Sequence, residues 1–594
     1  MKFSRLVEFF GRIEENNLRN KKTEILAEIL KEAEVEEVDK LIYLALGGLR
    51  PEFDRLEFNL AEKMIVRAIA QAVGTMVGEV ETEYQKIGDL GELVAKITNQ
   101  QLLNSQLTVS EAYSELEKIA LANGAGSQDK KVMGLAKLIK EMDAQSSKYI
   151  VRIVAGKLRL GFSEKTVLDA LSYMESGTKE YSETLETVFQ MRPDPGYLAK
   201  IVKEQGVEKA IEAMRIVIGT PIVPALAQRL KTASEMIEKM GRIYVEPKYD
   251  GTRVQIHFSR SRLQSSDRSL AQGSALGEQA SMFEEEKPSF FVRTFTRNLD
   301  ESSAMFPELQ RIADQIKADE VILDSEAVGY DPKTGKLVPF QLTITRKRKH
   351  GVEEASSSVP LRFFVFDIMY LDGKSLIKLP LQERRKILEE TIEGGEVLVV
   401  DKYIETDDPD VLRKYHAKQL AEGLEGALVK QIDGQYMPGR TGFNWVKFKE
   451  AEDSRAKLSD TIDVVIMGYY LGKGKRSGFG LGAFLVGVMS GDQIVTLAKV
   501  GTGISDEQFG ELRESLEKIK TKERSAEYVV PNILEPDVWV EPKIVVEVAA
   551  DEITVSPTHT AGYALRFPRL VKFRDDKSVG QITTLDEVKT MFGI

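Results

Sequence analysis

The chain has 594 residues, of which 42% are hydrophobic and 29% are charged, and its formal net charge is −11. Because a single hydrophobic core stops growing near about 250–300 residues, this length predicts two or three domains, and the composition excludes a disordered chain. The lack of cysteine excludes disulfides, thiolate zinc sites and a cysteine nucleophile, while the acidic balance restricts any nucleic-acid contact to local basic patches.

Residues 1 to 215 are predicted to be helical. Ile25, Leu26, Ile29 and Leu30, for example, recur at the spacing that places them on one face of a helix. The first 14 residues mix charged and apolar side chains, which excludes the uncharged core of a signal peptide, and no apolar run approaches the ~20 residues of a membrane helix. We therefore expect an intracellular, cytoplasmic protein.

Residues 216 to 450 are predicted to form a mixed α+β domain. Short β-forming runs at residues 321–323, 363–366 and 427–429 are separated by Gly, Asp and Pro turns. Residues 264 to 287 are rich in Ser, Gln, Gly and Glu, and we interpret them as a long exposed loop between two strands.

Residues 451 to 594 are predicted to form a small β-barrel. The turn Ser490-Gly491-Asp492 is typical of a β-hairpin. The strands that we expect span residues 462–470, 483–489, 494–500 and 544–548.

The segment from Glu246 to Arg253 reads Glu-Pro-Lys-Tyr-Asp-Gly-Thr-Arg and lies at a strand edge. A lysine amine attacks only when neutral, and with an ordinary pKa of about 10.4 roughly one lysine in a few thousand is neutral at pH 7. Burial and neighbouring cations both disfavour the ammonium form. Lys447 and Lys449, two residues apart on one strand face, and Lys430 would supply such cations and would also suit a triphosphate.

A Lys-Tyr-Asp-Gly tetrapeptide alone arises often by chance, so the interpretation of the Lys248 segment depends on residues that follow it in the sequence. They are Arg297, Glu326, Phe366, Glu425, Lys430, Lys447, Lys449, Arg566 and Arg569, in this order. With them the sequence resembles the covalent nucleotidyltransferase superfamily, and within it the archaeal and eukaryotic type of ATP-dependent DNA ligase. All six motifs of the superfamily are present in order.

The resemblance extends to the helical region, where residues 126–131 and 149–161 look like the DNA-binding domain of these ligases. It implies a multidomain protein: an all-α DNA-binding domain at 1–215, an α+β adenylation domain at 216–450 and a β-barrel OB-fold domain at 451–594. A hinge over residues 450 to 460 is then expected.

The resemblance implies a role for each matching residue. Lys248 would form the phosphoramide with AMP, and Glu246 would read the adenine amino group while Phe366 stacks on the ring. Arg253, Arg297 and Glu326 would surround the ribose, the phosphate and the nick terminus. Phosphate-binding positions are matched by Lys430, Lys447 and Lys449.

ATP and a divalent cation such as Mg²⁺ are the cofactors implied. Glu326 and Glu425 are suitable oxygen ligands for magnesium, which usually retains several waters. The four histidines, which show no zinc-binding spacing, are interpreted as structural. Arg566 and Arg569 would meet the pyrophosphate when the OB-fold domain closes onto the adenylation domain.

The expected partner is nicked duplex DNA, bound by a monomer associated with the nucleoid in replication, repair or recombination. Basic residues of the helical region would contact phosphates without reading sequence, namely Lys130, Lys131, Arg152, Lys157 and Arg159. Related archaeal ligases dock on a sliding clamp through a segment that ends in two phenylalanines. The matching residues 99–104 lack that aromatic pair, so clamp binding through them is not expected.

Three alternative interpretations compete with this one. An RNA ligase or a guanylyltransferase of mRNA capping shares the nucleophile, although the long helical domain and Glu246 disfavour both. An NAD-dependent ligase requires a four-cysteine zinc module, which this chain cannot form. A non-catalytic nick-binding protein is disfavoured because no motif lysine, arginine or carboxylate has been lost.

Overall fold

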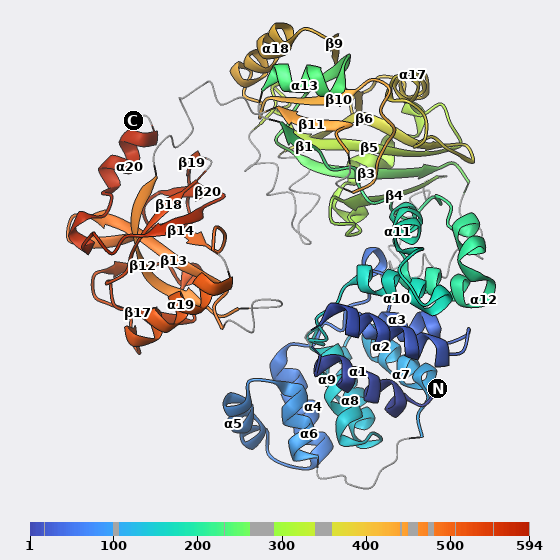
Figure 1. Ribbon diagram of the computed structural model, residues 1–594, viewed down its shortest axis with the longest axis vertical. Coiled ribbons are helices and arrows are strands. Elements are labelled where there is room, and N and C mark those ends of the chain that lie inside the picture. Colours follow the sequence, from blue (N-terminus) through green and yellow to red (C-terminus); the bar gives the residue numbers. More distant parts are fainter. Residues whose placement is uncertain are drawn as a thin grey trace. The chain divides into compact units, whose positions relative to one another are not determined.

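The chain divides into two compact units, Met1–Lys449 and Glu450–Ile594, each described here by itself. The computed structural model (Figure 1) describes residues 1–16, 18–98, 106–230, 232–261, 290–338, 359–439, 442–448, 461–472, 480–504, 506–550 and 552–592. Four segments of the sequence predictions lie outside these ranges: 99–104, 264–287, 450–460 and Lys449.

The N-terminal part of the first unit is helical, as predicted. Its helices are α1 (Phe3–Glu14), α2 (Arg19–Glu32), α3 (Val38–Ala45), α4 (Glu62–Val73), α5 (Val77–Ile87), α6 (Leu90–Ile97), α7 (Val109–Leu121), α8 (Ser127–Lys140), α9 (Ala144–Val154), α10 (Glu164–Ser176), α11 (Ser182–Met191) and α12 (Pro195–Ala213). They share one hydrophobic core, to which the apolar faces of α1 and α2 contribute.

Local sequence fixes several of these helix ends. The Asp89 and Asp143 side chains accept hydrogen bonds from backbone N–H groups of the first turn of α6 and α9, and Thr108 forms a capping box with Glu111 on α7. Gly74 ends α4 in the left-handed conformation, which costs glycine little.

Two facing sheets form the rest of the first unit. The first has the order β1-β11-β10-β2-β9, with β1 (Gln228–Leu230), β11 (Trp445–Phe448), β10 (Ala427–Gln431), β2 (Ile243–Pro247) and β9 (Ile404–Thr406). The second has the order β4-β3-β5-β6-β7, with β4 (Phe291–Thr296), β3 (Thr252–Ser259), β5 (Glu320–Gly329), β6 (Leu361–Leu371) and β7 (Lys374–Ser375), and β8 (Leu398–Val400) pairs with β6. The helices are α13 (Ala233–Met240), α17 (Leu381–Thr391) and α18 (Pro409–Ala421).

Strand register places polar residues on the first sheet's inner face. Leu428 lies opposite both Glu246 and Lys447, and Lys430 lies opposite Trp445. Because alternate residues of a strand share a face, these side chains all point the same way. The intervening apolar residues of β2, β10 and β11 pack into a separate core on the other face.

The second sheet turns a matching polar face inward. Arg253 pairs with Glu326 and Gln255 pairs with Asp324, while Val254 and Ile256 point into the outer core. A small apolar cluster joins the two inner faces, because it contains Phe366 from β6 and Trp445 from β11. The polar residues of the two sheets therefore line the same interlayer space.

The second unit is β-rich, as predicted. Its strands are β12 (Ile462–Tyr470), β13 (Ala483–Ser490), β14 (Gln493–Val500), β15 (Lys520–Thr521), β16 (Tyr528–Val529), β17 (Val538–Val540), β18 (Val545–Ala549), β19 (Glu552–Val555), β20 (Tyr563–Arg566) and β21 (Arg569–Phe573), with helices α19 (Asp506–Lys518) and α20 (Leu585–Phe592). The hairpin predicted at residues 490–492 is confirmed: β13 and β14 pair antiparallel around Gly491, whose φ is 62°.

None of the helices in the described ranges combines the length and the apolar character that crossing a membrane requires.

Candidate active site

Lys248 follows strand β2 and is held through its main chain. Its backbone N–H donates to the carbonyl of Gly426 at 2.9 Å, and its carbonyl accepts from the N–H of Glu425 at 3.0 Å. Gly426 has a φ of 121°, and a Cβ there would lie 2.6 Å from Nε2 of His416, so glycine is required. The Lys248 ammonium forms an ion pair with Glu425.

The turn after Lys248 is tightly packed. A Cβ on Gly251 would lie 2.5 Å from the Ala327 carbonyl oxygen and 2.9 Å from Cγ of Glu326. The Tyr249 ring stacks on Phe364 with centroids 4.2 Å apart, and its hydroxyl donates to Oδ1 of Asp401 at 2.8 Å. These contacts fix the backbone on which Lys248 is carried.

Glu246 and Lys430 form a fully buried ion pair beside Lys248. Lys430 Nζ lies 2.6 Å from Oε2 of Glu246, with side-chain exposures of 0% and 1%. The same Nζ donates to the Phe366 carbonyl at 3.2 Å. Glu246 Oε1, by contrast, is buried without a hydrogen-bond partner, so one oxygen of this carboxylate is left to accept a donor.

Aromatic side chains surround the Lys430 ammonium. Nζ lies 4.6 Å from the ring centroid of Phe366 and 4.3 Å from that of Trp445, and the two rings meet edge to face. Flat rings beside a buried carboxylate acceptor suit a base that is stacked and read at its edge.

Arg253 and Asp324 form a second ion pair in the same interlayer space. Arg253 donates to both Asp324 oxygens at 3.0 and 2.6 Å and to the Ala225 carbonyl at 2.6 Å. Tyr436 donates to Asp324 at 2.8 Å. Arg253 is thus fixed by protein partners, in addition to facing Glu326 across the strands.

The Glu326 carboxyl binds its proton more tightly than an exposed glutamate does. Burial raises its pKa to about 7, with the charges of Asp324 and Asp250 adding to the rise and those of Arg253 and Lys248 opposing it. Glu425 forms the ion pair with Lys248, and Glu326 packs against the turn that follows Lys248, at Gly251. Among the described residues no group of three or more His, Cys, Asp or Glu side chains is arranged to hold a metal. Two carboxylates still fit magnesium, because that ion takes few protein ligands and keeps waters and substrate phosphates.

The remaining predicted site residues are more peripheral. Arg297 is exposed in the turn after β4, where Thr296 caps the loop by hydrogen bonds with Asp300. Lys447 is half-buried on β11, on the same face as Glu246. Arg566 ends β20 and Arg569 begins β21 in the second unit.

The structure corrects part of the predicted DNA-binding set. Lys131 is 4% exposed and donates to the carbonyls of Phe58 and Ala120, and Arg152 is 4% exposed and pairs with Glu14 and Asp89. Both are buried by contacts inside the helical region and present no charge to a ligand.

Lys130, Lys157 and Arg159 remain at the surface. Lys130 is exposed on α8, and Lys157 forms an ion pair with Glu62. Arg159 is 48% exposed, pairs with Asp89 at 2.9 Å and has a left-handed φ of 61°.

Sequence reasoning missed several charged residues of the first unit. Arg384 is fully buried on α17 and binds both oxygens of Asp367 at 2.8 and 2.9 Å. Arg385, the next residue, faces Glu246, while Asp401 lies behind Tyr249 with a pKa raised to about 7 by burial and by the Glu246 charge. The doubled arginine in a helix was the only local signal.

In the second unit, sequence reasoning did not single out a cluster on Asp463. Arg574 Nη1 and Lys577 Nζ both reach its carboxylate, at 2.8 and 2.5 Å. The cluster ties the segment that follows β21 to strand β12.

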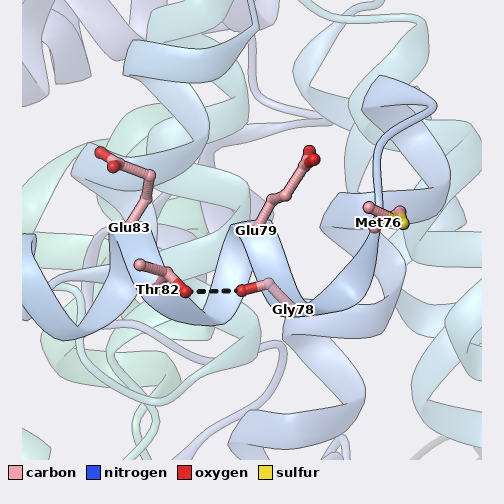
Figure 2. A pocket seen from close by; sticks show the side chains of 5 residues that line it. All are labelled: Met76, Gly78, Glu79, Thr82 and Glu83. Atoms are coloured by element: carbon pink, nitrogen blue, oxygen red, sulfur yellow. Dashed lines mark hydrogen bonds between the residues drawn. The ribbon is translucent and has the colours of Figure 1, made fainter.

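A surface hollow on α5 is separate from these residues. Figure 2 shows it lined by Met76, Gly78, Glu79, Thr82 and Glu83, with Thr82 donating to the Gly78 carbonyl at 2.8 Å. Two carboxylates and an exposed methionine on one helix offer no nucleophile and no phosphate-binding cation.

The two sheets and their inner face define a nucleotide-adenylating domain, preceded by a helical region and followed by a β-rich one. Family models agree with this division: "DNA ligase N terminus" matches residues 2–172, "ATP dependent DNA ligase domain" matches 224–449 and "ATP dependent DNA ligase C terminal region" matches 477–577. The chain belongs to the family of ATP-dependent DNA ligases.

Relatives of full length support the same family. A "Probable DNA ligase" of Dictyoglomus thermophilum is 41% identical over 100% of this chain and 97% of its own length. A "DNA ligase" of Saccharolobus solfataricus is 34% identical over 100% of this chain and 97% of its own. A solved structure titled "Pmar-Lig_PreS3" is 16% identical with a TM-score of 0.52, covering 96% of this chain and 99% of that one, and it supports the fold alone.

Proposed function

We propose that this enzyme seals nicks in duplex DNA through an AMP adduct on Lys248. The observation that carries the proposal is the pairing of a rigidly presented lysine with an adjacent buried carboxylate that has one unoccupied acceptor oxygen. That combination suits attack on a nucleotide whose base carries an amino group.

In the proposed first step, the Lys248 nitrogen attacks the α-phosphorus of ATP. A nitrogen–phosphorus bond forms, the bond to pyrophosphate breaks and the amine loses a proton. Because its ion pair with Glu425 stabilises the ammonium form, Lys248 becomes a nucleophile only after Glu425 turns from the amine or accepts its proton. AMP then passes to the 5′-phosphate of the nick, and attack by the 3′-hydroxyl joins the strands and releases AMP.

The other inner-face residues are proposed to bind and orient the nucleotide. Glu246 accepts from the adenine amino group and Phe366 flanks the ring. Lys430, which the sequence predicted to bind phosphate, is instead proposed to hold Glu246 in place, because its buried ammonium is paired with that carboxylate. Arg253, Arg297, Lys447 and Lys449 are proposed to surround the ribose and phosphates. Glu326 and Glu425 would hold Mg²⁺, which when bound neutralises charge that develops on phosphoryl oxygens.

The proposed domains are 1–215 for DNA binding, 216–450 for adenylation and 451–594 for closure, the last as an OB-fold. The pairing of β12 with β13, β17 and β18 supports a strongly curved sheet in the last region. In this scheme Arg566 and Arg569 contact the pyrophosphate. The enzyme is proposed to bind nicked duplex DNA as a monomer.

Incubation with ATP labelled at the α-phosphate, followed by unlabelled nicked duplex, tests the proposal. We expect label to appear on the protein and then to leave with sealing, and Lys248→Ala to prevent both. Lys374→Ala, an exposed lysine of β7, is the matched control. Labelled Lys248→Ala protein would refute the assignment, and nicked RNA offered in parallel tests the choice of polymer.

A further inference from the structure

Two consecutive buried arginines on α17 differ sharply in their hydrogen bonding. Every guanidinium nitrogen of Arg384 donates a hydrogen bond: Nε and Nη2 bind the two oxygens of Asp367, and Nη1 donates to the carbonyls of Leu379 and Gly434 at 2.6 and 3.1 Å. Arg385 is equally buried, at 2% exposure, but its Nη1 has no hydrogen-bond partner. Because Arg384 is buried on the same helix and is hydrogen-bonded, burial alone does not explain why Nη1 of Arg385 lacks a hydrogen bond.

Nη1 of Arg385, which makes no hydrogen bond, faces Oε1 of Glu246, which also makes none. Nη1 lies 3.6 Å from Oε1, within ion-pair distance but just beyond hydrogen-bond range, and both atoms are buried without a hydrogen-bond partner. A buried polar atom of a charged group that makes no hydrogen bond has lost its hydration without replacing it. Two such atoms therefore face each other at a position two residues before Lys248 in the sequence.

Other contacts hold Arg385 in this orientation. Its Nε donates to Glu389 at 3.2 Å, and its guanidinium carbon lies 4.8 Å from the ring centroid of Tyr403. Tyr403 packs against Tyr244 of β2, the same strand that carries Glu246, with centroids 4.2 Å apart. The guanidinium is therefore fixed against the strand whose carboxylate it faces.

We propose that Arg385 is a positioning residue that holds the Glu246 carboxylate for the 6-amino group of adenine and so sets the preference for adenine over 6-oxopurines. Lys430 fixes Oε2, and Arg385 orients Oε1 and keeps it an acceptor. A 6-oxopurine would place its carbonyl oxygen, an acceptor, against the Oε1 acceptor, where no hydrogen bond can form between them. The inference rests on the proposed role of Glu246 and goes beyond it.

Purine riboside triphosphate, which lacks the 6-amino group, separates positioning from a merely structural role. We would measure kcat and KM for adduct formation with ATP, purine riboside triphosphate and inosine triphosphate in the full chain. The variants are Arg385→Gln, Arg385→Lys and Lys386→Gln, the last an exposed neighbour on α17 that loses the same charge.

For Arg385→Gln we expect kcat/KM with ATP to fall about 10–100-fold, the range of one hydrogen bond to a charged group, mainly through KM. With purine riboside triphosphate the fall in kcat/KM should be less than about threefold, because this nucleotide lacks the 6-amino group that the oriented Glu246 carboxylate would contact. Discrimination against inosine triphosphate should weaken in parallel. Arg385→Lys should recover part of the preference, and Lys386→Gln should match the wild type.

Equal losses with ATP and purine riboside triphosphate would overturn the inference, because they would indicate a structural role. If Arg385→Gln does not fold, the same ratio measured on Arg385→Lys decides. Failure of the wild type to form an adduct with any of the three nucleotides would instead refute the proposed function.

Discussion

Lys430 and Glu246 form an ion pair inside the adenylation domain, with Nζ 2.6 Å from Oε2 and neither side chain more than 1% exposed. The pair joins β10 to β2, and β2 leads directly into Lys248. In the proposed scheme, the stability of the domain and the recognition of the nucleotide therefore depend on the same two side chains.

Lys430→Met should destabilise the adenylation domain by about 3–5 kcal/mol, because it leaves the Glu246 carboxylate buried without its main partner. The double variant Lys430→Met with Glu246→Gln should cost clearly less than the sum of the single changes. Urea unfolding in a Trp539→Phe background, where Trp445 is the sole tryptophan, measures this. Additive single effects would show that the two side chains are not coupled.

Gly251→Ala should lower the rate of adduct formation by about 100-fold, because the new Cβ would force the backbone away from the Ala327 carbonyl, and small misplacements of a nucleophile have effects of this size. Gly394→Ala is the control: its Cβ meets nothing within 4 Å and its φ is not positive. Single-turnover labelling measures both. If Gly251→Ala formed the adduct at the same rate as the control, the turn at Gly251 would not determine the position of Lys248.

Acid should destabilise the adenylation domain through His257. Burial, and secondarily the Arg293 charge, lowers the pKa of His257 to about 3. In the unfolded state His257 therefore takes up a proton near pH 6.5, whereas in the folded state it stays neutral down to about pH 3. The contribution of His257 to the free energy of unfolding is fully present above about pH 6.5 and is lost progressively as the pH falls toward 3. From pH 6.5 to 5 the loss is about 2 kcal/mol. His257→Gln should flatten this slope in urea titrations followed at Trp445, and an unchanged slope would exclude His257 as its source.

Arg566→Ala combined with Arg569→Ala should slow adduct formation while leaving the sealing of DNA that already carries AMP at its nick. The reason is that the proposed contact of these arginines is with pyrophosphate, which is present only in the first step. Rates on ordinary and pre-adenylylated nicks, measured side by side, provide the test. If the pre-adenylylated nick is sealed no better than an ordinary one, the assignment is wrong.

Local signals predicted much of the structure. The turn around Gly491 and the alternation along β11 each depend on residues within a few positions of one another. The position of Lys248 at a strand end could be predicted for the same reason.

Burial of charged residues could not be predicted in this way. Arg152 looked like a surface cation on a basic helix, yet its partner Glu14 lies 138 positions away in the sequence. Arg385 became part of the site only because α17 packs beside β2. Whether a charged side chain is buried depends on which distant element covers it, and a single sequence does not contain that pairing.

The basic surface of the helical region provides a last prediction. Lys157→Ala and Arg159→Ala should each weaken binding of nicked duplex, and each lost phosphate contact should reduce the slope of log affinity against log salt by about 0.9. Arg152→Ala should leave that slope unchanged and instead lower stability by about 3 kcal/mol, because it removes the partner of Glu14 and Asp89. Titrations of labelled nicked duplex at several KCl concentrations, beside thermal unfolding of each variant, separate the two effects. A reduced salt slope in Arg152→Ala, with unchanged slopes in the other two variants, would reverse the assignment of surface and buried cations, because counterion release requires a side chain that reaches the phosphate.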